Sequence, residues 1–167
     1  MPAQRQFSTR RLLPFALLGV LAALSGCATE WDSAVVFPAS YSSTYEKLHD
    51  CKASAHPAAK YVVTWMSPEA KDAMDALAAL PAGSTETIAW PENAVFVKVQ
   101  YDDSACSEVQ SFTAMKKLAA GAATDAGDWK WQHVGADGEC LNCDNGTACS
   151  GCHTQPACNG LVCTKRN

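Results

Sequence analysis

The segment "AVFVKVQY", residues 94–101, decides the fold because its side chains alternate strictly between two faces. Valines recur at every second position and are followed by a tyrosine, while Phe96, Lys98 and Gln100 stand between them. A period of two is typical of a β-strand. The preceding "WPEN", residues 90–93, is a turn signal. This segment therefore predicts a strand with two chemically different faces.

Three further segments predict strands that pair with it. "KYVVTWM", residues 60–66, is rich in β-branched and aromatic residues, which favour strands. The segments 109–119 and 128–134 have a similar character, and the second would place its two tryptophans and His133 on one face. These segments predict an antiparallel sheet.

Two helices are expected between and before these strands. Ser43 and Glu46 form a capping box, which predicts a helix over residues 43–54. Ser67 followed by Pro68 predicts the start of a second helix through "EAKDAMDALAAL". Helices combined with an antiparallel sheet predict an α+β fold, mainly a β-sheet with about two helices.

The amino terminus has the composition of an export signal. Basic residues precede the apolar run 12–26, which is too short to span a bilayer comfortably. The run leads into "LSGC", residues 24–27, which resembles the lipobox of bacterial lipoproteins, whose cysteine is acylated. We therefore expect residues 1–26 to be a lipoprotein signal peptide and Cys27 to be the lipid anchor. The alternative is an ordinary signal peptide with a chance cysteine.

These features predict where the mature protein lies. Residues 27–41 would be a tether, although Trp31 and the Val35–Val36 pair could dock on the domain, which we expect at residues 42–167. Ala28 resembles the lipoprotein pattern for the outer membrane, so we expect a periplasm-facing protein anchored there. Removing the signal leaves 10 basic against 17 acidic residues, a charge of −7, which argues against nucleic acid as a partner.

The cysteine count becomes informative in such an oxidising compartment. The chain has nine cysteines, and assigning Cys27 to lipid leaves eight. Cys149, Cys152 and His153 form the pattern C-x-x-C-H, which attaches haem c, because two thiols at this spacing can bond one porphyrin edge above an axial histidine. Six cysteines remain for three disulfides.

Fifteen pairings of these six cysteines are possible, and locality favours one of them. Residues 135–167 contain few large aliphatic side chains, so this segment needs covalent staples. Cys140 with Cys143 and Cys158 with Cys163 are plausible local pairs, and Cys51 with Cys106 would be the long one. The alternatives to haem are a purely disulfide-bonded knot and a zinc site built from cysteines 140, 143, 149 and 152.

Together these segments resemble the cytochrome P-460 family, whose domain also includes the cytochromes c′-beta. The resemblance covers residues 43–164 and rests on "WPENAVFVKVQY", "FTAMKKL", "GDWKWQHV" and the C-terminal C-x-x-C-H. It implies a mainly antiparallel sheet, a homodimer, thioether bonds from Cys149 and Cys152, and His153 as the axial ligand. It also implies that Lys98 matches a lysine that hydroxylamine-oxidising members bond to the porphyrin. The alternative for Lys98 is an ordinary lysine on the solvated face of a strand.

The proposed iron could have one protein ligand or two. An empty site opposite His153 would let iron bind small ligands, whereas a second protein ligand would make an electron carrier. No spacing marks any candidate as that second ligand, and the two histidines at 49 and 56 are expected at the surface or in caps. The candidates are Met66, Met74, Met115, His49, His56 and His133.

The sequence therefore favours a monohaem cytochrome with five-coordinate iron. It would bind or oxidise hydroxylamine or nitric oxide and pass electrons to a redox partner protein. A distal base would be needed to accept substrate protons, and the sequence does not place one. Two alternatives remain: a membrane-tethered electron carrier and a disulfide-stapled lipoprotein without a cofactor.

Overall fold

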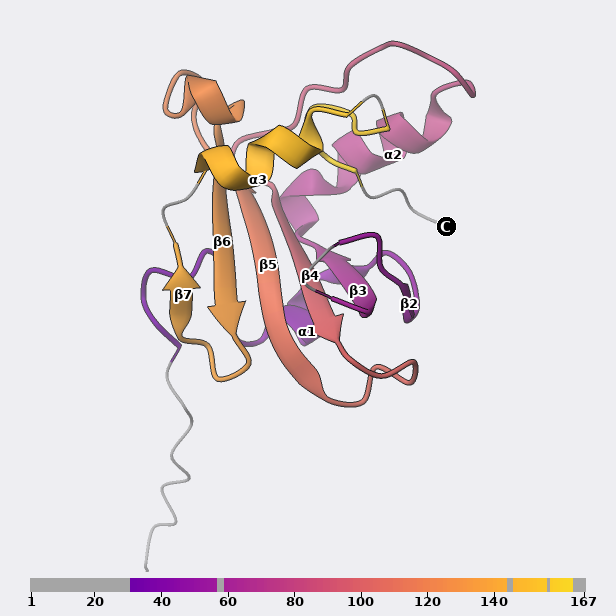
Figure 1. Cartoon of the computed structure of the whole chain (residues 1–167). Helices are drawn as coiled ribbons and strands as arrows, with labels where there is room; N and C mark the ends of the chain where they lie inside the picture. The colour runs from indigo at the N-terminus through magenta and orange to yellow at the C-terminus, as the bar shows by residue number, and fades with distance from the viewer. Residues whose placement is uncertain (1–30, 57–58, 144–145, 156, 164–167) are drawn as a thin grey trace, which may run out of the picture.

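The computed structural model describes residues 31–56, 59–143, 146–155 and 157–163, which fold around one antiparallel sheet (Figure 1). The sheet has seven strands in the order β1-β3-β4-β5-β6-β7, and β2 shares the outer edge of β3 with β1. The strands are β1 (Glu46–Lys47), β2 (Lys52–Ala53), β3 (Tyr61–Met66), β4 (Val95–Tyr101), β5 (Val109–Lys117), β6 (Trp129–Gly135) and β7 (Cys140–Asn142). The predicted α+β class with a mainly antiparallel sheet is confirmed.

The four long strands lie where the sequence predicted them. β3 to β6 correspond to the segments at 60–66, 94–101, 109–119 and 128–134, and each pairs with the next in chain order. Neighbouring strands are joined by connections that reverse the chain direction, which gives antiparallel pairing throughout.

The helix predicted over residues 43–54 is wrong. Only Tyr41–Thr44 form a short helix, α1, and Tyr45 already has an extended backbone. The Ser43 hydroxyl donates a hydrogen bond to the Ser40 carbonyl instead of capping a following helix. The chain then enters β1, and Leu48 donates its backbone N–H to Thr64 in β3. The free edge of β3 therefore takes the backbone hydrogen bonds that a helix would have used.

The second predicted helix is confirmed with a different start. A 3-10 turn, Pro68–Ala70, leads into α2, Lys71–Ala79. Ser67 precedes it, but its hydroxyl accepts a hydrogen bond from the backbone N–H of Val95, 3.0 Å away. Ser67 thus ties the helix start to β4. The other helical elements are a 3-10 turn, Thr124–Ala126, and α3, Gly146–His153.

The two faces of the sheet carry separate hydrophobic cores. Val95, Val97 and Val99 of β4 pack on one face with Phe112 and Phe37. The second core lies on the opposite face, under α2, and its largest members are Met66, Met74, Phe96, Met115, Trp90, Trp129 and Trp131. The predicted alternation of β4 is confirmed, because Phe96 points to the second core while the valines point to the first.

Residues before position 42 contribute to the first core. Trp31, Val35 and Val36, which the sequence identified as able to dock, pack against it, and Phe37 is 4% exposed. The rings of Trp31 and Phe37 meet edge to face at 5.0 Å. Packing therefore extends at least to Trp31, within the segment assigned to the tether. The predicted signal peptide at 1–26 and Cys27 lie outside the described residues.

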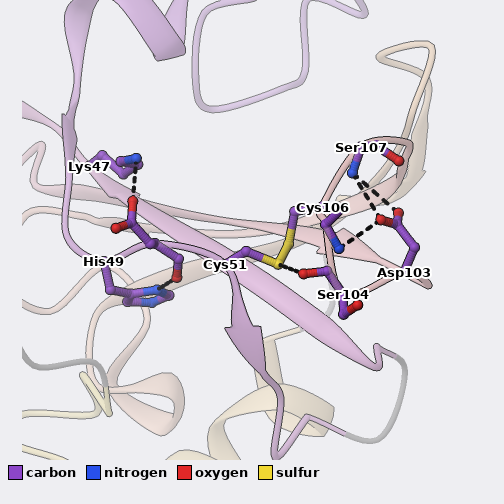
Figure 2. Close-up of a disulfide and its surroundings, with 9 residues drawn as sticks. Lys47, His49, Cys51, Asp103, Ser104, Cys106 and Ser107 are labelled. Atoms are coloured by element: carbon purple, nitrogen blue, oxygen red, sulfur yellow. Dashed lines mark hydrogen bonds and ion pairs between the residues drawn. A yellow bond between two sulfur atoms is a disulfide. The ribbon is translucent and has the colours of Figure 1, made fainter.

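Three disulfides confirm the pairing favoured by locality. They are Cys51–Cys106, Cys140–Cys143 and Cys158–Cys163. Cys51–Cys106 joins the β1–β2 edge to the turn after β4, where the Asp103 carboxylate accepts hydrogen bonds from the backbone N–H groups of Ala105 and Ser107 (Figure 2). The described part of the chain contains no helix long and apolar enough to cross a membrane.

Candidate functional site

A cavity opens between the second-core face of the sheet and α3. Its volume is about 180 Å³, and it opens to solvent. Helix α3 lies across the end of the sheet near β6 (Figure 1). Cys149, Cys152 and His153 of α3 form one wall, and side chains from β3 to β6 form the other. The C-x-x-C-H motif and Lys98, which are 51 residues apart in the sequence, therefore face one space.

Strand register builds the sheet wall of this cavity in two rows. Directly paired residues of antiparallel strands point to the same face. Lys98 pairs with Thr64 on β3 and with Thr113 on β5, which makes a polar row. One step along the face, an apolar row crosses the same strands through Met66, Phe96, Met115 and Trp131, and all of these except Met66 line the cavity. The cavity lies where the apolar core gives way to polar side chains.

Helical spacing brings the motif residues of α3 together. Residues three and four positions apart lie on one helix face, so Cys149 is a neighbour of both Cys152 and His153. Cys149 is half-buried and Cys152 is exposed, and neither is in a disulfide. Burial raises the pKa of Cys149, and the nearby Cys152 adds to this effect, which keeps Cys149 a neutral thiol.

His153 is held in a defined tautomer. Its Nδ1 lies 2.7 Å from the backbone carbonyl oxygen of Leu161, which can only accept a hydrogen bond. Nδ1 therefore carries the proton, and Nε2 is left with a free lone pair. The ring meets Trp131 edge to face at 4.5 Å. Metal-binding histidines share this feature, because a hydrogen bond from one ring nitrogen orients the other.

The electrostatic surroundings keep His153 uncharged. Burial lowers its pKa below the usual value, the hydrogen bond to Leu161 opposes this shift, and the charge of Lys98 adds to it. A neutral imidazole is the form that binds metals.

Lys98 faces the cavity from the middle of β4. Burial lowers the pKa of its ammonium group, and the charge of Lys52 lowers it further. The described residues supply no carboxylate within ion-pair distance of Lys98. A lysine in such surroundings is deprotonated more readily than an exposed one, and the neutral amine is a nucleophile.

Two histidines that the sequence placed at the surface or in caps lie elsewhere. His49 is 6% exposed, because it packs against β3. Its Nδ1 donates to the carbonyl of Asp50 at 2.8 Å, so its Nε2 accepts from the hydroxyl of Thr64 at 3.0 Å. His56 is half-buried and lines the cavity. The sequence offered no signal for the contact between His49 and Thr64, since that contact depends on how the chain meets the β3 edge.

The six candidates for a second metal ligand are separated by the fold. Met66 and Met74 are completely buried in the second core and do not line the cavity. His49 and His133 do not line it either. His56 and Met115 are the two candidates that do.

One buried polar atom on the cavity wall lacks a partner. Trp131 is 5% exposed, and its indole Nε1 has no hydrogen-bond partner among the described residues. A buried donor without an acceptor is destabilising and is uncommon in folded proteins. Sequence patterning predicted that Trp131 shares a strand face with Trp129 and His133, but not that this face lines a cavity or that the Trp131 N–H would be left unpaired.

The zinc alternative is overturned by the disulfides. A four-thiolate site needs Cys140 and Cys143, which are bonded to each other. Within the described ranges, no group of three or more histidine, cysteine or carboxylate residues could hold a metal ion by itself.

Fold and site together define an α+β protein with an antiparallel sheet and a cavity beside a C-x-x-C-H helix. No protein family model matches the chain, and no curated protein is significantly similar to it.

Proposed function

We propose that this protein is a monohaem c-type cytochrome. Haem would be attached through Cys149 and Cys152, and its iron would be held by Nε2 of His153. One observation carries the proposal: six of the eight described cysteines are paired, and the two that remain are those of the C-x-x-C-H motif. An oxidising compartment leaves few free thiols, so a bonded role for these two is expected.

The cavity supports a flat, largely apolar cofactor. Phe96, Met115 and Trp131 provide an apolar wall against which a porphyrin could pack. The cavity is smaller than a porphyrin but open to solvent, so a bound porphyrin would be only partly enclosed by it. The exposure of Cys152 agrees with attachment near the open side of the cavity.

We further propose that the sixth iron position is open to small nitrogen compounds such as hydroxylamine or nitric oxide. The bound iron would exchange electrons with the ligand and with a redox partner protein. The chain itself would receive substrate protons. Thr64 lines the cavity and donates its hydroxyl proton to His49 Nε2, so this pair could accept a proton from a ligand.

A second candidate function is a membrane-tethered electron carrier. The observation that favours it is the presence of His56 and Met115 on the cavity wall, since either could occupy the sixth iron position. A low-spin iron spectrum that does not change with nitric oxide, and becomes high-spin in His56→Ala or Met115→Ala, would support the carrier.

The wider proposal follows the resemblance to the cytochrome P-460 and cytochrome c′-beta proteins. It includes a lipid anchor at Cys27, an outer-membrane location facing the periplasm, and a homodimer. The mainly antiparallel sheet agrees with the fold that this resemblance implies. Globomycin-sensitive processing of the expressed chain would test the anchor, and light scattering would test the dimer.

The haem proposal is tested by expressing the chain with a cytochrome c maturation system. We expect a coloured protein that keeps its haem after denaturation and gains the mass of one haem. The Cys149→Ser/Cys152→Ser variant should lose covalent haem, whereas Cys140→Ser/Cys143→Ser, the neighbouring C-x-x-C pair, should keep it. A colourless parent protein of unmodified mass would favour the cofactor-free lipoprotein.

Lys98 gives a separate prediction because it faces the same cavity. If its Nζ is bonded to the porphyrin edge, the ferrous Soret band should be red-shifted relative to ordinary c-type haem. The shift should disappear in Lys98→Ala and persist in Lys116→Ala, a lysine on neighbouring β5 outside the cavity lining. An ordinary c-type spectrum in the parent protein would rule out the bond while leaving haem attachment intact.

A further inference from the structure

The acceptor for His153 belongs to a tight turn, residues 158–163. Asn159 and Val162 exchange two backbone hydrogen bonds, of 2.9 and 3.0 Å. Gly160 and Leu161 stand between them with positive φ angles of 54° and 71°. Two successive residues of this kind define a type I′ turn, a conformation that glycine adopts easily and leucine rarely. This turn presents the Leu161 carbonyl to His153.

The Asn159 side chain fastens the turn to a distant loop. Its Oδ1 accepts the backbone N–H of Ile88 at 2.7 Å. Its Nδ2 donates to the backbone carbonyl of Glu86 at 2.8 Å. Because both ends of the amide are used on the backbone of residues 86–88, no smaller side chain could make the same connection.

Two tryptophans hold the backbone of the same turn. Trp90 Nε1 donates to the Asn159 carbonyl at 3.0 Å, and Trp129 Nε1 donates to the Gly160 carbonyl at 3.2 Å. The Cys158–Cys163 disulfide closes the turn at its base, with the Cys163 sulfur 3.3 Å from Nδ1 of His153. The turn is therefore fixed on three sides, and the one carbonyl directed at the motif histidine is that of Leu161.

We propose that Asn159 is a positioning residue for the metal ligand His153. By fastening the turn to residues 86–88, Asn159 holds the Leu161 carbonyl on Nδ1 of His153, and this fixes the tautomer and the ring orientation with which Nε2 meets iron. The effect on iron rests on the proposed haem function. The hydrogen bonds that connect residues 86–88 to His153 do not depend on it.

The hydrogen bond to Leu161 should lower the reduction potential of the iron. A histidine that donates from Nδ1 to a carbonyl becomes a more basic ligand at Nε2. A more basic ligand stabilises ferric iron relative to ferrous iron. Loosening the turn should therefore weaken the hydrogen bond to Leu161 and raise the reduction potential.

The test is Asn159→Ala in the haem-loaded protein. At a fixed applied potential, we expect the ratio of ferrous to ferric protein to rise about tenfold. This matches the lower end of the change in metal affinity or activity that follows when a hydrogen-bond partner of a metal ligand is removed. For a one-electron couple this equals a shift of about 59 mV. The iron–histidine stretching frequency in the resonance Raman spectrum should fall. Asn159→Asp keeps the acceptor for Ile88 but loses the donor to Glu86, so its shift should be smaller. Asn142→Ala, at an exposed position of β7, is the control.

A second measurement is independent of haem. In the haem-free chain, nitrogen NMR of His153 should show the Nδ1–H tautomer in the parent and a mixture of tautomers in Asn159→Ala and, to a lesser extent, in Asn159→Asp. Unchanged potential, stretching frequency and tautomer in both variants would overturn the positioning role. A parent protein that lacks haem but shows the Nδ1–H tautomer and its loss in Asn159→Ala would overturn the proposed function and leave the positioning role standing.

Discussion

Replacing Cys51 and Cys106 with serine should lower the free energy of unfolding by about 4 kcal/mol. This disulfide joins residues 55 positions apart, so it removes a large loop-closure entropy from the unfolded chain. It also joins the outer edge of β3, where β1 and β2 are only two residues each, to the turn after β4 (Figure 2). Urea denaturation of parent and variant, in the same haem state, would measure the change.

The matched control is Cys140→Ser/Cys143→Ser. This pair is three positions apart, and the loop-closure relation gives it a stabilisation of about 2 kcal/mol. The critical result is which variant loses more free energy of unfolding. The substitutions are chemically identical, and only the loop length and the location of the disulfide differ. Equal losses from both pairs would show that loop closure does not govern the stability of this fold.

The sequence could predict the faces of the strands but not the wall of the cavity. Alternation in residues 94–101 places Phe96 and Lys98 on one face, which the structure confirms. The neighbours Thr64 and Thr113 follow only from the pairing register, and register depends on the loops and on the packing of partner strands. A single alternating segment carries no information on the loops or on the packing of the partner strands.

The failed helix at 43–54 shows a local signal losing to tertiary contacts. The capping box of Ser43 and Glu46 is a valid helix start in isolation. In the folded chain, Leu48 and His49 are both buried against β3, and this burial stabilises the strand-like path. Propensity effects are small compared with the burial of an apolar side chain, so the helix signal is overridden.

Short-range cysteine spacing was more informative than any other feature of the site. Cys140–Cys143 and Cys158–Cys163 are close in sequence, and identifying them left Cys51 with Cys106. The partners of His153 could not be found in this way. Trp131 lies 22 residues before it, and Leu161 reaches it through a turn that depends on contacts with residues 86–90.

Substituting His153 with alanine should have the largest effect at the proposed iron. Outer-shell partners of metal ligands change affinity or activity by about 10–100-fold, and removal of the ligand itself should exceed that range. The variant protein should lose the histidine-ligated iron spectrum and the iron–histidine stretching band. His153 lies beside an open cavity, so added imidazole should be able to enter and restore both signals.

His133→Ala is the control for this experiment. His133 lies on β6, two residues from Trp131, but it does not line the cavity, so its removal should leave the spectrum unchanged. The signal could be lost because the iron ligand is gone or because the variant misfolds. Added imidazole distinguishes these causes, because a misfolded protein would not regain a defined histidine-like spectrum. An unaltered spectrum in His153→Ala would mean that another side chain holds the iron. Since His56 and Met115 also line the cavity, alanine substitution of each in the His153→Ala background would then identify it.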